Sequence, residues 1–130
     1  MTGSRILVVD DNPSNLKLFT YLLAMPGYEV RTAQDAREAL AVLAEFHPLL
    51  IIMDLQLPDI DGLTLTRQLK ADPKMRDVAI VAVTASAMKG DEEKAIAAGV
   101  DGYMTKPIDK RAFRAMVEGY IRDWGGQNGH

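Results

Sequence analysis

The sequence predicts an α/β domain in which a five-stranded parallel sheet is covered by helices on both faces. Two observations support this fold class. Short segments with strand character alternate with segments whose apolar residues recur at helical spacing. The most apolar strand segments, such as residues 49–53, are hydrophobic at nearly every position, as expected where both faces of a sheet are buried.

The first half of the chain contains three strand segments, at residues 5–9, 28–33 and 49–53. A helix is expected from Pro13, which suits a first helical turn, to Pro26-Gly27, which ends it. The next helix follows Asp35, a suitable N-cap, and ends before His47. These elements give the pattern strand, helix, strand, helix, strand.

The second half continues this alternation. Strand segments are expected at residues 79–85 and 102–105, and helices at residues 63–72, 91–98 and 113–124. Gly125-Gly126 is expected to end the last helix. Segment 28–33 alternates apolar and polar residues and is expected at an edge of the sheet, whereas the continuously apolar strands are expected in its centre. We therefore expect one domain over residues 1–124, followed by a short flexible tail at residues 125–130.

The composition excludes several classes of protein. The chain has 130 residues, a formal net charge of −3 and no cysteine. The acidic balance argues against a nucleic-acid partner, and the lack of cysteine excludes disulfides, thiolate zinc sites and a cysteine nucleophile. No segment is long enough to cross a bilayer, and the apolar run 6–9 is too short for a signal peptide. A cytoplasmic protein without membrane insertion is expected.

Polar side chains stand at the carboxyl ends of four of the five strands. They are Asp10 and Asp11 after the first strand, Asp54 after the third, Thr84 near the end of the fourth and Lys106 after the fifth. In a parallel sheet these ends converge on one edge, where ligands bind. Two carboxylates about 4 Å apart repel by roughly 4 kcal/mol at an effective dielectric near 20. Three carboxylates beside one ammonium group therefore predict a bound cation.

The types of residue in this group suggest phosphoryl chemistry. Carboxylate oxygens without Cys or His favour Mg²⁺, with Asp11 as a direct ligand and Asp10 acting through water. Asp54 can attack a phosphoryl group and form an acyl phosphate. Lys106 places a positive charge near the phosphoryl oxygens, and the Thr84 hydroxyl can donate a hydrogen bond to one of them.

Each residue alone also has a structural explanation. Asp10 and Asp11 could be turn or cap residues, Thr84 a strand residue and Lys106 a solvated charge. Asp54 is harder to explain in this way, because an apolar strand has no structural need for a carboxylate. The occurrence of suitable groups at four strand ends favours the functional interpretation.

Other motifs fail. The run Asp59-Ile60-Asp61-Gly62 resembles part of a calcium loop, but Leu57 and Gln68 stand where its first and last acidic ligands should be. Gln56 replaces the second aspartate of a DxD phosphatase motif. His47 and His130 lack metal-ligand spacing, and the chain has neither GxGxxG nor GxxxxGK[ST].

Four blocks resemble response-regulator receiver domains of bacterial two-component signalling: VVDDN (8–12), IIMDLQLPDIDG (51–62), VAVTA (81–85) and GYMTKPI (102–108). The resemblance covers essentially the whole chain. It implies a flavodoxin-like (βα)5 three-layer sandwich with strand order 2-1-3-4-5. It also implies that Asp54 accepts a phosphoryl group from a sensor histidine kinase or a histidine phosphotransfer protein, with Mg²⁺ as cofactor, for which Mn²⁺ can substitute.

The resemblance also implies a role for each matching residue. The implied metal ligands are oxygens of Asp10, Asp11 and Asp54 and the backbone carbonyl of Gln56. Lys106 contacts the phosphoryl group, and its bond to Pro107 is cis. Thr84 and Tyr103 form a switch pair, in which the Thr84 hydroxyl moves toward phosphate and vacates space for the Tyr103 ring. This movement remodels the surface formed by the last two helices and the strand between them.

Residues 83–99 and 102–108 resemble stand-alone regulators of the DivK type and also receivers fused to hybrid kinases. We expect no output domain, so a signal would pass to a downstream protein target or onward by phosphorelay. Gln56 and Ser86 flank the site and should influence how long the phosphoryl group survives autodephosphorylation. Two other functions stay open: a docking module independent of phosphorylation, and a phosphatase or phosphotransferase that turns over a small molecule.

Overall fold

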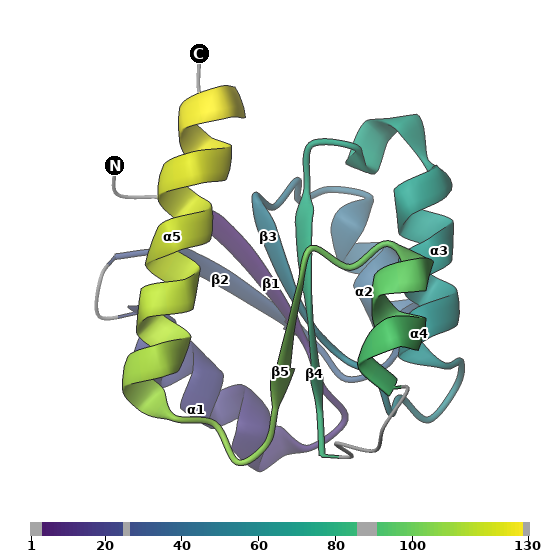
Figure 1. Cartoon of the computed structure of the whole chain (residues 1–130), viewed down its shortest axis with the longest axis horizontal. Coiled ribbons are helices and arrows are strands. Elements are labelled where there is room, and N and C mark those ends of the chain that lie inside the picture. The colour runs from purple at the N-terminus through teal and green to yellow at the C-terminus, as the bar shows by residue number, and fades with distance from the viewer. Residues whose placement is uncertain (1–3, 25–26, 86–90, 129–130) are drawn as a thin grey trace.

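The computed structural model describes residues 4–24, 27–85 and 91–128, except for the side chains of Asp91 and of residues 124–128 (Figure 1). Five parallel strands form one sheet in the order β2-β1-β3-β4-β5. The strands are β1 (Arg5–Val9), β2 (Glu29–Ala33), β3 (Leu50–Asp54), β4 (Ala79–Thr84) and β5 (Gly102–Thr105). The helices are α1 (Pro13–Ala24), α2 (Ala36–Leu43), α3 (Gly62–Ala71), α4 (Asp91–Ala98) and α5 (Lys110–Asn128), with a 3₁₀ helix η1 (Pro73–Met75).

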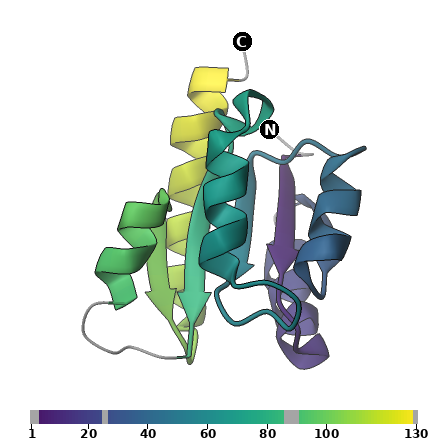
Figure 2. The same ribbon diagram turned by 90° about the vertical axis from the view of Figure 1, so that its right-hand side faces the viewer.

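The helices form two outer layers around the sheet (Figures 1 and 2). Helices α1 and α5 cover one face, where the Phe19 and Phe113 rings lie 5.1 Å apart between centroids. Helices α2, α3 and α4 cover the other face and bury residues such as Ala39, Leu65 and Ala95. This arrangement confirms the predicted three-layer fold and its strand order.

Burial along the strands agrees with their positions in the sheet. Every residue of β3 and β4 is buried, because helices cover both faces of these central strands. In the edge strand β2 the residues Arg31 and Thr32 are exposed, and Ala33 alone is buried. The alternating pattern of residues 28–33 thus correctly predicted an edge strand.

The predicted end of the last helix at Gly125-Gly126 was wrong, because α5 continues to Asn128. A glycine in a helix costs about 1 kcal/mol relative to alanine but keeps its N–H and C=O groups, so it weakens a helix without removing a hydrogen bond. Asp35 caps α2 as predicted, accepting a 2.7 Å hydrogen bond from Glu38 N–H. Among the described residues, no helix is long and apolar enough to cross a membrane.

Candidate functional site

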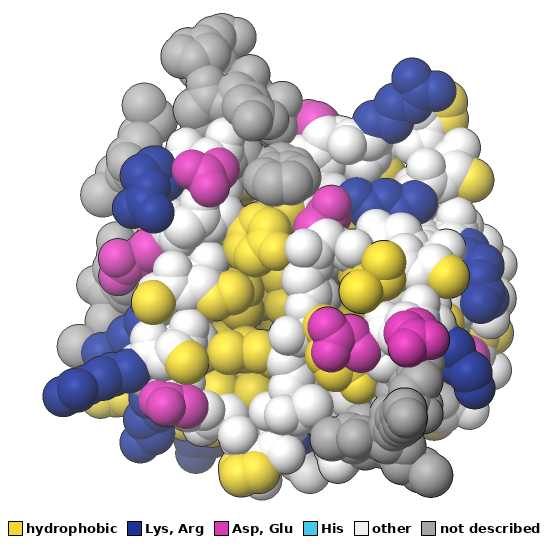
Figure 3. Space-filling view, viewed as in Figure 1, with side chains coloured by type: hydrophobic (Ala, Val, Ile, Leu, Met, Phe, Trp, Pro, Cys, Tyr) yellow, Lys and Arg dark blue, Asp and Glu magenta, His cyan; other side chains and the backbone are white. Residues whose placement is uncertain are grey.

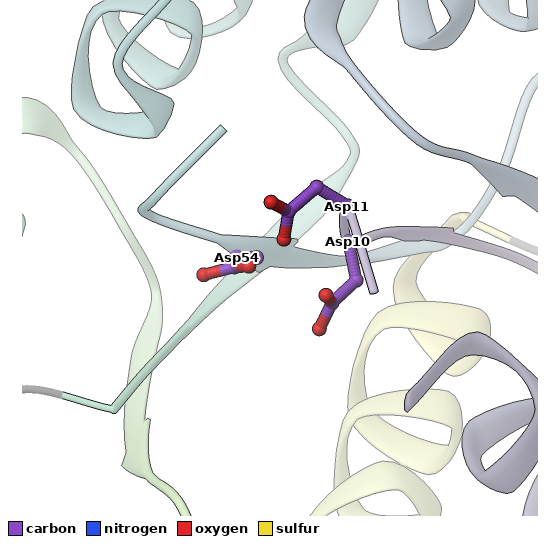
Figure 4. A group of neighbouring side chains, drawn as sticks. All are labelled: Asp10, Asp11 and Asp54. Atoms are coloured by element: carbon purple, nitrogen blue, oxygen red, sulfur yellow. The ribbon is translucent and has the colours of Figure 1, made fainter. Parts of the chain in front are cut away.

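The carboxyl ends of the central strands bring three aspartates together (Figure 4). Asp54 is the last residue of β3, while Asp10 and Asp11 follow β1, the neighbouring strand. One carboxylate oxygen from each aspartate lies within 4.8 Å of the other two. Asp10 is 1% exposed and Asp54 is 3% exposed, whereas Asp11 is open to solvent. Two carboxylates of the group are therefore buried, and the third, that of Asp11, is exposed.

Lys106 lies across the two buried carboxylates. Its Nζ is 3.1 Å from Asp10 Oδ2 and 3.6 Å from Asp54 Oδ2. The bond from Lys106 to Pro107 is cis, and the Lys106 N–H donates a 2.8 Å hydrogen bond to the carbonyl of Thr84 at the end of β4. The Lys106 ammonium group thus pairs with two of the three clustered carboxylates, and the group keeps an excess of negative charge that a cation would neutralise.

The set of donors fits Mg²⁺. Three carboxylates offer hard oxygen ligands, and the exposure of Asp11 leaves room for the waters that Mg²⁺ usually retains. Carboxylates held this close repel one another, and a bound cation would relieve this repulsion. The residues present could therefore hold a divalent cation of this kind.

Asp10 is further held by groups from the start of α1. Its Oδ1 accepts a 2.9 Å hydrogen bond from Asn12 N–H. The Asn15 amide Nδ2 lies 3.3 Å from Asp10 Oδ2 and 3.5 Å from Oδ1. Asn15 was not among the residues predicted from the sequence, although a polar residue in the first helical turn after the aspartate pair could have suggested it.

Burial raises the pKa of Asp54 from its usual 3.8 to about 6. The 3.0 Å hydrogen bond from Gln56 N–H to Asp54 Oδ1 lowers this pKa, as does the Lys106 charge, while Asp10 and Asp11 raise it. Asp54 is therefore mostly ionised at neutral pH, but its charge is poorly solvated. Such a carboxylate is a suitable nucleophile, and a bound cation would favour its ionised form.

Gly62 closes the loop that follows Asp54. A Cβ atom at this position would lie 2.6 Å from the Asp54 carbonyl oxygen and 2.7 Å from Leu55 Cα, closer than real Cβ atoms approach. The Gly62 N–H also donates a 3.1 Å hydrogen bond to the Leu55 carbonyl. Glycine at this position thus permits a close approach between the start of α3 and the end of β3.

The aspartates of the rejected calcium loop have structural partners. Asp61 is the N-cap of α3 and accepts a 3.1 Å hydrogen bond from Leu63 N–H. Asp59 accepts hydrogen bonds from the N–H groups of Ala36 and Arg37 in the first turn of α2. Both carboxylates therefore serve helix ends, and the structure gives no support to a calcium loop.

Thr84 and Tyr103 lie on the same face of the sheet. Thr84 pairs with Thr105 and Ala82 pairs with Tyr103, so the two side chains are diagonal neighbours on adjacent strands. Thr84 is 3% exposed, and Tyr103 is half-buried against the core beneath α2, α3 and α4. The two residues of the predicted switch pair are therefore close in the sheet.

The remaining candidates lie outside this group. His47 is exposed, and its Nε2 is 3.0 Å from Asp77 Oδ1, as expected for a surface residue. Gln56 is also exposed, beside Asp54. Pro26, Ser86 and His130 lie outside the described residues, as does the side chain of Trp124.

The fold and the site define an α/β domain of the flavodoxin-like type with three converging carboxylates, which could hold a cation, at the carboxyl edge of its sheet. The chain belongs to the response regulator receiver domain family, which its sequence matches over residues 6–118. The resemblance seen in the sequence motifs is thus confirmed.

Comparison with individual proteins gives the same result. The chain is 43% identical over 123 residues to the polar-differentiation response regulator DivK of Brucella ovis, covering 95% of this chain and 99% of that protein. A CheY-like receiver from Methanospirillum hungatei superposes with a TM-score of 0.89 at 27% identity, covering 98% of this chain and all of the other. The receiver domain of a sensor histidine kinase from Pseudomonas aeruginosa, solved with a magnesium ion coordinated in its active site cleft, has a TM-score of 0.85 and 33% identity, covering 94% of this chain and all of its own.

Proposed function

We propose that this protein is a phosphorylation switch in which Asp54 accepts a phosphoryl group from a phosphohistidine. The donor would be a sensor histidine kinase or a histidine phosphotransfer protein, the class of partner that two-component receivers use. One observation carries the proposal: a buried, poorly solvated carboxylate lies beside two further carboxylates and within 3.6 Å of a lysine ammonium group. An acceptor of phosphoryl groups needs this combination of nucleophile, cation ligands and positive charge.

Mg²⁺ would be held by carboxylate oxygens of Asp10, Asp11 and Asp54 and by the backbone carbonyl of Gln56. The magnesium ion in the related Pseudomonas receiver supports this assignment. When bound, Mg²⁺ supplies positive charge to the phosphoryl oxygens and lowers the repulsion between phosphate and the acidic pocket.

In the proposed transfer, an ionised Asp54 oxygen attacks the phosphorus atom of the phosphohistidine. A P–O bond forms while the P–N bond breaks, and the imidazole nitrogen keeps the electron pair and takes a proton from solvent. Asp54 is oriented by the hydrogen bond from Gln56 N–H to Oδ1, and Oδ2 faces Lys106. Lys106 then stabilises negative charge on the phosphoryl oxygens.

Autodephosphorylation reverses the acceptor chemistry with water as the nucleophile. Water attacks the phosphorus atom, the P–O bond to Asp54 breaks, and inorganic phosphate leaves as the carboxylate is regenerated. Gln56 is exposed next to Asp54, so its side chain can influence the access of water. We propose that Gln56 and Ser86 together tune the lifetime of the phosphorylated state.

Phosphorylation would be transmitted through Thr84 and Tyr103. A hydrogen bond from the Thr84 hydroxyl to the phosphoryl group would draw this side chain toward Asp54 and leave space for the Tyr103 ring. The affected surface comprises α4, β5 and α5, where Figure 3 shows apolar side chains gathered between α5 and β5. Ile96 of α4 is 59% exposed. A downstream protein, or a further protein of a phosphorelay, would bind this surface.

The proposal is tested by intact-mass spectrometry after incubation with acetyl phosphate or phosphoramidate, with and without Mg²⁺. We expect a gain of one phosphoryl group that depends on Mg²⁺ and is lost in Asp54→Asn, with Mn²⁺ able to replace Mg²⁺. Asp61→Asn is the matched control, because it changes an exposed carboxylate of the same loop to a residue that also caps helices well. Circular dichroism verifies that both variants are folded.

Other outcomes would favour the competing functions. Failure of the wild-type protein to gain phosphate from either donor would indicate a docking module whose acidic pocket serves another purpose. Release of product from a phosphorylated small molecule, without a persistent label on Asp54, would indicate a turnover enzyme.

A further inference from the structure

The first turn of α2 is bound by a carboxylate from a distant part of the chain. Asp59 Oδ1 accepts a 2.9 Å hydrogen bond from Ala36 N–H, and Asp59 Oδ2 accepts a 3.0 Å hydrogen bond from Arg37 N–H. Asp59 Oδ1 also accepts a 2.9 Å bond from Ile60 N–H. The hydrogen bond from Ala36, with those from Arg37 and Ile60, holds the pKa of Asp59 below its usual value, so this side chain is ionised at neutral pH.

These bonds complete the cap of α2. A helix begins with N–H groups that lack partners within the helix, and its N-terminus favours negative charge. Asp35 accepts from Glu38 N–H, the third of these groups, while Asp59 accepts from the first two. The cap is therefore shared between a residue of the helix's own segment and a residue of the loop that follows Asp54.

Backbone hydrogen bonds hold both ends of the loop between Asp54 and Gly62. At its start, Leu55 N–H donates to the Val83 carbonyl at 3.2 Å, and at its end Gly62 N–H returns to the Leu55 carbonyl at 3.1 Å. Gln56 and Pro58, which lie between these points, are exposed. Asp59 therefore fixes the middle of the loop to α2, an element outside the loop.

This loop carries Gln56, which lies beyond the end of β3. Gln56 supplies the N–H group that orients Asp54 Oδ1, and its carbonyl is the backbone ligand in the proposed Mg²⁺ site. A loop released from α2 could move Gln56 and weaken both interactions. Displacements of about 1 Å at a reacting centre can cost on the order of a hundredfold in rate.

We infer that Asp59 is a positioning residue of the phosphorylation site, which ties the loop after Asp54 to the first turn of α2 and so preorganises Gln56 and Asp54 for Mg²⁺. This inference rests on the proposed function. Its distinguishing feature is that loss of Asp59 should weaken Mg²⁺ binding, whereas loss of Asp35, which accepts its hydrogen bond from Glu38 N–H of the same helix turn, should not.

The inference is tested by titrating Mg²⁺ alone into the wild-type protein, Asp59→Ala, Asp59→Asn and Asp35→Ala, following backbone amide shifts by NMR. We expect the Mg²⁺ dissociation constant of Asp59→Ala to rise about tenfold, in the range found when groups that orient metal ligands are removed. Asp59→Asn keeps one carbonyl acceptor and should be intermediate. Asp35→Ala should bind Mg²⁺ as the wild type does, although α2 loses a cap of similar kind.

Urea unfolding of the same four proteins separates a change at the site from a general loss of stability. If Asp59→Ala does not fold, Asp59→Asn provides the comparison with Asp35→Ala. An Asp59 variant with wild-type Mg²⁺ affinity, or an Asp35 variant weakened as much as the Asp59 variant, would overturn the inference while leaving the proposed function intact. A wild-type protein that neither binds Mg²⁺ nor accepts phosphate would overturn both.

Discussion

Replacing Asp54 by asparagine should stabilise the metal-free protein at neutral pH, although it removes the proposed phosphorylation site. Asparagine has nearly the same shape and can still accept the hydrogen bond from Gln56 N–H. It carries no charge, so it does not suffer the burial penalty and the repulsion from Asp10 and Asp11 that raise the pKa of Asp54.

The size of the effect follows from this pKa. A rise from 3.8 in the unfolded chain to about 6 in the folded protein corresponds to roughly 3 kcal/mol, at about 1.4 kcal/mol for each pKa unit. This figure is an upper limit, because local relaxation relieves part of the strain of a buried charge. Asp54 is 3% exposed, so solvent screens little of it.

The sign of the pH dependence is fixed by the direction of the shift. The folded carboxyl group binds its proton more tightly than the unfolded one, so ionisation of Asp54 opposes folding. The penalty is absent below the unfolded pKa of 3.8, grows as the pH rises, and is complete above the folded pKa of about 6. The advantage of Asp54→Asn should therefore be largest at neutral pH and fall to about half near pH 5.

The assay is urea unfolding followed by far-UV circular dichroism in the presence of EDTA, at about pH 5 and about pH 7.5. Asp61→Asn serves as the control and should leave the free energy of unfolding unchanged. An Asp54→Asn variant that is less stable than the wild type at neutral pH would refute this reasoning. A stability difference that does not vary with pH would refute it as well.

Three further changes have directions fixed by the structure. Lys106→Ala removes a charge that lowers the pKa of Asp54, so this pKa should rise above 6. The variant should still accept phosphate but bind its partner poorly. A ¹³C NMR titration that gives an unchanged or lower pKa for Asp54 would contradict this prediction. Gly62→Ala places a Cβ atom against the Asp54 carbonyl, so it should destabilise the folded protein by about 1–3 kcal/mol and slow the phosphorylation of Asp54. An unchanged midpoint of urea unfolding would count against this close approach. Phe113→Ala leaves a cavity beside Phe19 between the sheet and helices α1 and α5, and should lower the free energy of unfolding by urea by about 3–5 kcal/mol without changing Mg²⁺ affinity. A decrease of less than about 1 kcal/mol would disprove this packing role.

The excess negative charge at the site also links Mg²⁺ to stability. Because Asp54 and Asp10 are buried close together with a single lysine between them, a cation that binds the folded protein should stabilise it. The relief of repulsion is available to the folded state, where the carboxylates converge. The convergence of these carboxylates thus makes the metal-free site electrostatically unfavourable.

The sequence alone determined the fold class, the positions of the central and edge strands, and the residues at the strand ends. Helical spacing, continuous apolar runs and turn residues are local features, so they can be recognised without a structure. In a parallel sheet the carboxyl ends of the strands must meet at one edge, and this rule brought Asp10, Asp54 and Lys106 together before any distance was known.

The tertiary structure decided the contacts that join segments far apart in the chain. The hydrogen bonds from Ala36 and Arg37 of α2 to Asp59 connect segments that no sequence pattern relates. The pKa of Asp54 likewise depends on burial by several elements at once. Such features arise from the packing of distant parts of the chain, which periodicity and turn chemistry do not encode.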